Sequence, residues 1–351
     1  MTTVTPSSEA APNPMPHRRR WWFYLRRGLM VVAILFVALV LLGVTYQTAA
    51  TEIDKRTYPP RGQLYNVNGH QMHMVCMGEG SPTVILQAGG VAESLWWYWV
   101  QNELAVHTKV CAFDRPGLGW SEAVSGMRDP ATILSELHAL LAEANVPPPY
   151  LMAGHSYGGL LTRLYAAQYP QEIKGIVLVD AFVVGMHPQD FGDKREVDAL
   201  IAQYDWLRIL LYAQTRTGLI RLANPGEFHK AGYPAPIASE LTALQLRNEV
   251  MDTDFAEKVT ALWALIETSA KADNLGNLPV ILLWGSLSDM TKERNTALLK
   301  ETFTYSSNSV TRYVEGADHL SILGTERYAR QITDAVLDMI ATTQTGKPLS
   351  Q

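Results

Sequence analysis

The feature that most constrains this chain is a Gly-x-Ser-x-Gly motif, formed by Gly154, Ser156 and Gly158. The apolar residues 149–153 before the motif favour a buried strand, and residues 160–168 after it favour a helix. A serine on such a strand-to-helix turn needs small neighbours, because the two backbones approach each other closely there. The pattern therefore predicts that Ser156 is a nucleophile, with its hydroxyl presented at the carboxyl end of a strand.

A base and an orienting acid are expected downstream of the serine. A serine hydroxyl attacks well only when a base takes its proton and a third group orients that base. His319 follows the strand candidate 310–314, in the loop before the last helix. Asp289 follows the buried strand candidate 278–285. Ser156, Asp289 and His319 then each fall at the carboxyl end of a parallel strand, where catalytic groups gather.

Two other carboxylates compete for the role of the acid. Asp318 directly precedes His319, and neighbouring side chains in a loop rarely face each other. Asp180 ends the strand candidate 175–179 and could serve from that alternative position. We favour Asp289 over both. No two histidines have the spacing of metal ligands and the cysteines do not cluster, so neither a metal site nor a cofactor is expected.

Five motifs in order make the chain resemble the α/β-hydrolase family, in its esterase, lipase and aminopeptidase-like branch. They are the turn around the serine, the segments 82–90 and 113–121, and the segments that end in Asp289 and His319. The resemblance covers about residues 63–340 and implies a mostly parallel eight-stranded sheet flanked by helices, with a helical cap inserted into it. The expected division is a core of residues 62–181 and 278–341, a cap of residues 182–277 and a polar tail of residues 342–351.

The resemblance also implies acyl chemistry on a small-molecule substrate. Ser156 would attack a carbonyl carbon while His319 takes its proton, and water would then hydrolyse the acyl-enzyme. A carboxylic ester is the expected bond. An aminopeptidase of the proline-iminopeptidase type and a cofactor-free perhydrolase are alternatives. A non-catalytic binding module is disfavoured because all three candidate residues are present, and relatives that attack with an aspartate, the haloalkane dehalogenases and epoxide hydrolases, are disfavoured by the serine.

Two backbone amides are expected to form an oxyanion hole. The amide of Tyr157 follows the nucleophile at the N-terminus of a helix, where negative charge is stabilised. Gly90 is expected to supply the second amide, with Val91 as the alternative. Many relatives carry His-Gly where this chain has Ala88 and Gly89. The backbone donor is therefore kept, while the contacts that hold this loop are left open.

A separate pattern marks the N-terminus. Residues 28–46 carry no charge and are rich in aliphatic side chains, a length close to the minimum of roughly 17–25 residues for a transmembrane helix. The aromatic residues 21–24 fit the membrane interface. Five arginines precede the span, while the charges after it roughly cancel. The positive-inside rule then places the basic tail, residues 1–27, in the cytosol and the catalytic domain across the membrane, on a linker of residues 47–61.

The alternative for the N-terminus is a signal peptide cleaved near residues 48–50, where small side chains occur. The apolar stretch is longer than the usual core of a signal peptide, about 7–15 residues, so we favour an uncleaved single-pass anchor.

Cysteine usage and charge bear on compartment and partners. Cys76 and Cys111 fall in predicted strands that the resemblance makes neighbours. They could be buried free thiols, which we favour, or a cross-strand disulfide in an oxidising compartment. The formal net charge is -5 and no long basic run lies outside the N-terminal tail, so nucleic acid is not an expected partner.

Overall fold

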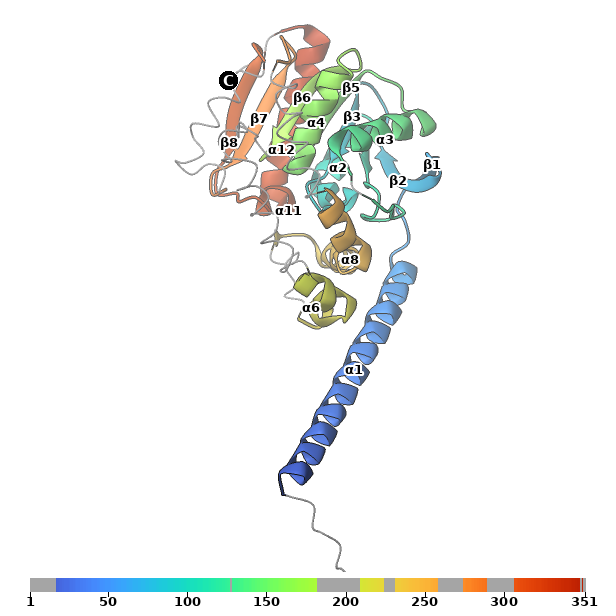
Figure 1. Cartoon of the computed structure of the whole chain (residues 1–351). Coiled ribbons are helices and arrows are strands. Elements are labelled where there is room, and N and C mark those ends of the chain that lie inside the picture. The colour runs from blue at the N-terminus through green and yellow to red at the C-terminus, as the bar shows by residue number, and fades with distance from the viewer. Residues whose placement is uncertain are drawn as a thin grey trace, which may run out of the picture.

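The computed structural model describes residues 17–126, 128–181, 209–223, 231–257, 274–288, 306–347 and 349. Its centre is one eight-stranded sheet with helices on both faces (Figure 1). The strands are β1 (Gln63–Val67), β2 (His70–Met77), β3 (Thr83–Gln87), β4 (Val110–Phe113), β5 (Tyr150–His155), β6 (Ile173–Val179), β7 (Val280–Gly285) and β8 (Ser309–Val314).

The sheet has the order β1-β2-β4-β3-β5-β6-β7-β8. The strands from β3 to β8 run parallel, whereas β2 is antiparallel to both β1 and β4. The central strands β3, β4, β5 and β7 are buried along their whole length, as parallel strands covered on both faces must be. The predicted mostly parallel, eight-stranded sheet is therefore confirmed.

Two hydrophobic clusters cover the faces of the sheet. On one face pack η1 (Ser94–Trp97), α2 (Tyr98–Leu104), α11 (Ser321–Gly324) and α12 (Glu326–Thr345). On the other face pack α3 (Pro130–Glu143) and α4 (Tyr157–Gln168). This layering fixes the strand ends in space, so that the loops at their carboxyl ends gather at one edge of the sheet.

The described parts of the insertion between β6 and β7 contain helices that are joined by turns. It contains the helical residues 209–216, α6 (Leu219–Ala223), α8 (Ala235–Gln245) and the helical residues 248–257. Figure 1 shows α8 below the sheet and α6 further down, beside the upper part of the N-terminal helix. The cap boundaries at residues 182 and 277 stay a prediction, since residues 182–208 and 258–273 lie outside the described part of the chain.

The N-terminal helix α1 (His17–Thr57) extends away from the domain (Figure 1). Among the described residues, α1 is the one helix that is long and apolar enough to cross a membrane, over Trp21–Thr57. No part of its most apolar 18-residue stretch is buried against the rest of the protein. The linker predicted for residues 47–61 is helical up to Thr57, because no glycine or proline interrupts it before Pro59.

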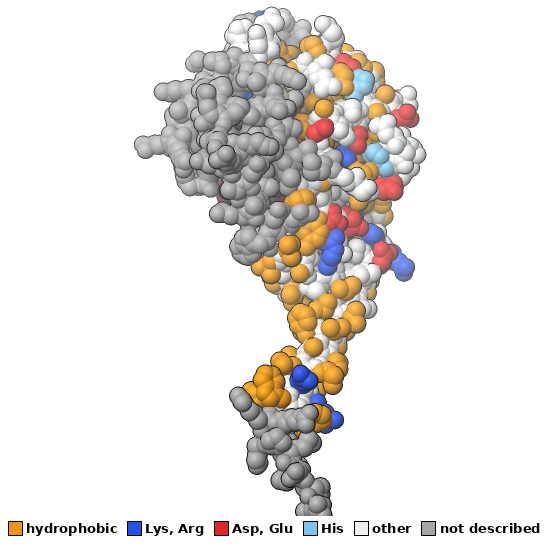
Figure 2. Space-filling model, viewed as in Figure 1, with side chains coloured by type: hydrophobic (Ala, Val, Ile, Leu, Met, Phe, Trp, Pro, Cys, Tyr) orange, Lys and Arg blue, Asp and Glu red, His pale blue; other side chains and the backbone are white. Residues whose placement is uncertain are grey.

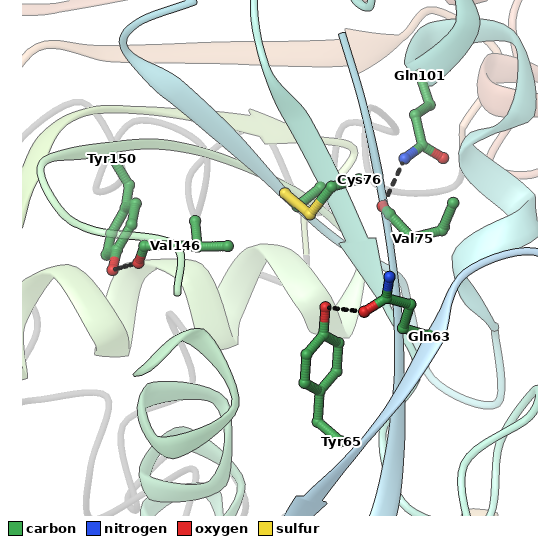
Figure 3. Close-up of a disulfide and its surroundings, with 8 residues drawn as sticks. Gln63, Tyr65, Val75, Cys76, Gln101, Val146 and Tyr150 are labelled. Carbon is green, nitrogen blue, oxygen red and sulfur yellow. Dashed lines mark hydrogen bonds between the residues drawn. A yellow bond between two sulfur atoms is a disulfide. The ribbon is translucent and has the colours of Figure 1, made fainter. Parts of the chain in front are cut away.

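A disulfide joins Cys76 on β2 to Cys111 on β4, so our preference for free thiols is wrong. The two cysteines are direct partners in the antiparallel register, and the side chains of such partners lie next to each other on the same face. Figure 3 shows the bridge beside Val75, whose carbonyl accepts a hydrogen bond from Gln101 of α2 at 2.9 Å.

Candidate active site

Ser156 lies at the sharp turn between β5 and α4. Its backbone has φ 52° and ψ -122°, a conformation that L-residues rarely adopt. The flanking glycines make this turn possible. A Cβ on Gly154 would lie 2.3 Å from the carbonyl oxygen of Gly158, and a Cβ on Gly158 would lie 2.4 Å from the carbonyl oxygens of Gln87 and Ala88. The predicted need for small residues around the serine is confirmed.

His319, in the loop after β8, links the serine to a buried carboxylate. Its Nε2 lies 3.0 Å from the Oγ of Ser156, and its Nδ1 hydrogen-bonds to Oδ2 of Asp180. The Asp180 side chain is fully buried, whereas that of His319 is 41% exposed. The three groups form the serine, base and acid arrangement that activates a hydroxyl for attack.

The carboxylate that pairs with His319 in the described part of the chain is thus Asp180, the alternative that we ranked below Asp289. Asp289 itself lies outside the described residues. Asp180 directly follows β6, which lies next to the strand that carries Ser156. The end of β7 supplies donors to Asp180 instead: the hydroxyl of Ser288 lies 2.7 Å from Oδ2 and the amide of Gly285 lies 3.3 Å from Oδ1.

The electrostatics of Asp180 suit the orientation of a histidine. Burial acts to raise its pKa, but hydrogen bonds from His319 and Ser288 and the charge of His319 outweigh burial, so the pKa is lowered. An ionised Asp180 holds a proton on Nδ1 and leaves Nε2 free to accept one from the serine. The competing Asp318 accepts bonds from the amides of Leu320 and Ser321, both at 2.9 Å, and so caps its own loop.

His155 supports His319 in a way that the sequence did not reveal. Its Nε2 donates to the backbone carbonyl of His319 at 3.0 Å, and the two rings lie 4.6 Å apart. Burial, followed by the charge of His319, lowers the pKa of His155 to about 3. The ring is therefore neutral at ordinary pH, and its single N–H fixes the backbone that carries the base.

The two residues predicted for the oxyanion hole are neighbours in space. A Cβ on Gly90 would lie 3.9 Å from the Cβ of Tyr157, and a Cβ on Gly89 would lie 3.2 Å from the Cβ of Ser156. Across the described part of the chain, no backbone carbonyl accepts from the amide of Gly90 or Tyr157. The next residue, Val91, has φ 52°, a strained conformation for a β-branched side chain. The loop that carries Gly90 thus lies beside the start of α4, which carries the amide of Tyr157.

Arg115 holds the loop that contains Ala88 and Gly89, in which many relatives carry a histidine at the position of Ala88. Its Nη1 and Nη2 donate to the carbonyls of Ala88 and Gly89 at 2.8 and 2.7 Å. The same guanidinium makes a two-point contact with Glu257 of the cap, at 2.8 and 3.0 Å, and both side chains are buried. Burial acts to lower the pKa of Arg115, but the charge and hydrogen bonds of Glu257 raise it overall. Arg115, a permanent cation, thus connects the cap to residues 88–91, which we call the oxyanion loop after its predicted role.

A buried acid lies behind the same loop. Gln245 of α8 donates to the carbonyl of Val91 at 2.6 Å and to Oε2 of Glu93 at 2.5 Å. Burial, followed by the charge of Asp114, raises the pKa of Glu93 to about 8. The carboxyl group is therefore largely protonated at neutral pH.

No three His, Cys, Asp or Glu side chains in the described ranges come together as metal ligands would. Catalysis without a metal or cofactor stays a prediction.

Comparison with known proteins agrees with this architecture. A family model described as alpha/beta hydrolase fold matches residues 82–324. An uncharacterised protein of Schizosaccharomyces pombe is 31% identical over 150 residues, which are 34% of this chain and 28% of that protein. Lipase 3 of a Moraxella species is 24% identical over 172 residues, 48% of this chain and 50% of the lipase. The chain thus matches between about a quarter and a half of the length of these relatives.

Solved structures extend the likeness of the fold. An epoxide hydrolase superposes with a TM-score of 0.61 and 22% sequence identity, over 80% of this chain and 98% of that one. At this identity the likeness shows the fold alone, and the chemistry must be argued from the side chains.

Proposed function

This chain belongs to the α/β-hydrolase family, and we propose that it is a serine hydrolase that cleaves carboxylic esters through an acyl-enzyme on Ser156. The observation that carries the proposal is the hydrogen-bonded series from Ser156 through His319 to the buried Asp180. The proposal takes Asp180, which the sequence offered as the alternative acid, in place of Asp289.

The reaction follows from these contacts. As Oγ of Ser156 attacks the substrate carbonyl carbon, Nε2 of His319 takes the hydroxyl proton, and Asp180 stabilises the resulting imidazolium. The amides of Gly90 and Tyr157 stabilise the negative charge that develops on the carbonyl oxygen. When the tetrahedral intermediate collapses, His319 gives its proton to the departing alkoxide. Water then attacks the acyl-enzyme with His319 again as base, which releases the acid and restores the serine.

Two observations weigh against an epoxide hydrolase and against an aminopeptidase. The residue at the turn is a serine, whereas the epoxide hydrolases of this family attack with an aspartate. An aminopeptidase would need an acidic cap residue to bind the ammonium group of its substrate. Two of the described cap carboxylates are already committed, because Glu240 pairs with Arg61 and Glu257 pairs with Arg115.

A substrate screen tests the enzyme class. Purified full-length protein would be given p-nitrophenyl esters of graded chain length beside aminoacyl-naphthylamides, with Ser156→Ala as the matched control. We expect ester hydrolysis that the substitution reduces by several orders of magnitude. Hydrolysis of the amides alone would favour the aminopeptidase, and ester hydrolysis that survives in Ser156→Ala would contradict the proposal.

We also propose that α1 is an uncleaved membrane anchor. Its C-terminal part is integrated with the cap: Gln47 donates to the carbonyl of Leu246 at 2.6 Å, and Arg221 donates to Gln47 at 3.0 Å and to Asp54 at 2.6 Å. Cleavage near residues 48–50 would cut this helix between residues that bind the cap. These contacts support retention of the whole helix.

The orientation is proposed from charge and redox chemistry. Five arginines precede the apolar span, which favours a cytosolic N-terminus. The Cys76–Cys111 disulfide suits an oxidising compartment on the other side. Alkaline phosphatase fused after Gln351 should then be active, and a fluorescent protein that folds only in the cytosol should stay dark. The reverse pattern would overturn the topology.

A further inference from the structure

An exposed apolar surface lies on the cap where it meets α1. We define the cap underside as Ile209, Leu210, Leu219 and Leu222, whose exposed fractions are 70%, 46%, 55% and 69%. Four large aliphatic side chains within such a short stretch expose more than the single apolar residues that are scattered over an ordinary surface. A surface of this kind needs a partner.

Close backbone contacts place the cap underside at the depth of the apolar span of α1. A Cβ on Gly43 would lie 2.6 Å from the carbonyl oxygen of Thr217, and a Cβ on Gly218 would lie 2.7 Å from the ring of Tyr46. The chain just before Leu219 therefore touches α1 within the uncharged residues 28–46. Only a few residues separate this contact from the exposed leucines of α6.

We propose that the cap underside docks on the lipid bilayer that holds α1, with its aliphatic side chains inserted among the acyl chains near the surface. This inference rests on the proposed membrane anchor. The 28–46 segment of α1 is about as long as the hydrocarbon core is thick, at about 1.5 Å per residue. When that segment fills the core, a cap that contacts Gly43 and Tyr46 lies at the membrane surface.

Continuity with the helix identifies lipid as the occupant. Leu39 and Leu42 of α1 are each 67% exposed and must face lipid if the helix spans the membrane. Figure 2 shows hydrophobic side chains that continue from the shaft of α1 onto the part of the domain next to it. The same bilayer therefore covers both surfaces without a further partner.

Charged groups beside the underside do not oppose docking. Arg216 pairs with Asp252 at 2.9 Å, and Arg221 pairs with Asp54 at 2.6 Å. Each of these two cations is matched by a carboxylate, so neither Arg216 nor Arg221 brings an unpaired charge beside the leucines.

Docking would also steady the candidate site. The cap that carries the underside reaches the oxyanion loop in two places: Gln245 binds the carbonyl of Val91, and Glu257 binds Arg115. α8, which carries Gln245, also packs against α1. The membrane surface is thus joined to the loop through one packed unit.

Fluorescence quenching in vesicles tests the proposal on the full-length chain. Leu222→Cys would carry an environment-sensitive dye, and Val106→Cys serves as the matched control. Val106 is 77% exposed and lies in the turn before β4, at the amino ends of the parallel strands and so opposite to the carboxyl ends that carry the candidate site. Cys76 and Cys111 are bonded to each other, so the dye reaches only the new thiol under non-reducing conditions. Thermal melts of both labelled proteins check the fold.

The vesicles would contain phosphatidylcholine and phosphatidylglycerol, with and without lipids that carry a nitroxide quencher near the top of one acyl chain. We expect nitroxide lipid to quench the dye at Leu222 several-fold more than the dye at Val106. Equal quenching at the two positions would overturn the proposal. A blue-shifted but unquenched dye at Leu222 would also overturn it, because a protein surface would then cover the leucines.

Flotation separates this inference from the anchor on which it rests. Vesicles that retain the protein after an alkaline carbonate wash show that α1 is inserted, whatever the quenching shows. Protein that is washed off would refute the anchor and the docking together.

Discussion

The two-sided contact of Arg115 leads to a quantitative prediction about the oxyanion loop. Arg115→Gln removes the guanidinium group that donates hydrogen bonds to the carbonyls of Ala88 and Gly89. The adjacent Gly90 amide should then lose its position beside Ser156. We expect a lower kcat with little change in KM, because an oxyanion donor acts mainly in the transition state.

The expected fall in kcat follows from the contribution of a single oxyanion hydrogen-bond donor. Complete loss of an oxyanion donor costs about 10²- to 10³-fold in kcat. A loop that is displaced but still present keeps part of this stabilisation, so we expect a fall of about 10- to 100-fold. Arg115→Gln also leaves the buried Glu257 without its partner, which typically costs about 3–5 kcal/mol of stability.

A double variant separates the two effects. Glu257→Gln alone keeps the contacts of Arg115 with the loop carbonyls, and kcat should stay near that of the wild type. Arg115→Gln combined with Glu257→Gln leaves no unpaired buried charge, so its Tm should recover toward the wild type while its kcat stays low. Initial rates on one p-nitrophenyl ester and thermal melts of all four proteins give the comparison.

The reasoning is refuted if the double variant recovers kcat along with Tm, because Arg115 would then act only through stability. An unchanged kcat in Arg115→Gln would show that the loop holds its position without the cation.

Three further predictions concern other groups. Asp180→Asn should lower kcat by about 10⁴-fold, with Asp289→Asn within tenfold of the wild type; the opposite order would restore Asp289 as the acid. Because burial raises the pKa of Glu93 from 4.5 to about 8, the folded state keeps a proton that the unfolded state releases. Stability should therefore fall between these pH values by about 1 kcal/mol per pH unit, and Glu93→Gln should remove that fall in denaturant titrations from pH 5 to 8. Replacing Cys76 and Cys111 with serine should cost about 2–4 kcal/mol in the same titrations, and no change would contradict a structural role for the disulfide.

The parts of this protein that the sequence predicted correctly depend on local patterns. Continuous apolar strands predict a parallel sheet buried on both faces, and the glycines around Ser156 predict a strained turn. Both are properties of a few consecutive residues. The position of His319 beside Ser156 agrees with the chain order that the sequence suggested, and its role as base stays a prediction.

The sequence alone left the acid open because a carboxylate follows the end of each of two neighbouring strands, Asp180 after β6 and Asp289 after β7. What selects Asp180 is the direction of its side chain, which depends on its unusual φ of 41° and on the donors that Ser288 and Gly285 bring from β7. Neither can be read from the order of residues.

The sequence left the disulfide as the less favoured of two readings, and it gave no sign of the loop contacts, for a related reason. Cys76 and Cys111 face each other only because of the strand register, and a shift of one residue would point them to opposite faces. Arg115 lies in a segment recognised as a motif, but its partner Glu257 is far along the chain, in the cap. Contacts between distant segments need the tertiary structure.

The central claim, that Ser156 is activated by His319, is tested most directly by covalent trapping. Intact protein would be treated with a fluorophosphonate, and its mass would be measured by mass spectrometry. Peptide sequencing would then locate the labelled residue. The account predicts one phosphonyl group per chain, on Ser156, with no labelling in Ser156→Ala and much slower labelling in His319→Ala. A label on another serine, or labelling that persists in Ser156→Ala, would contradict it.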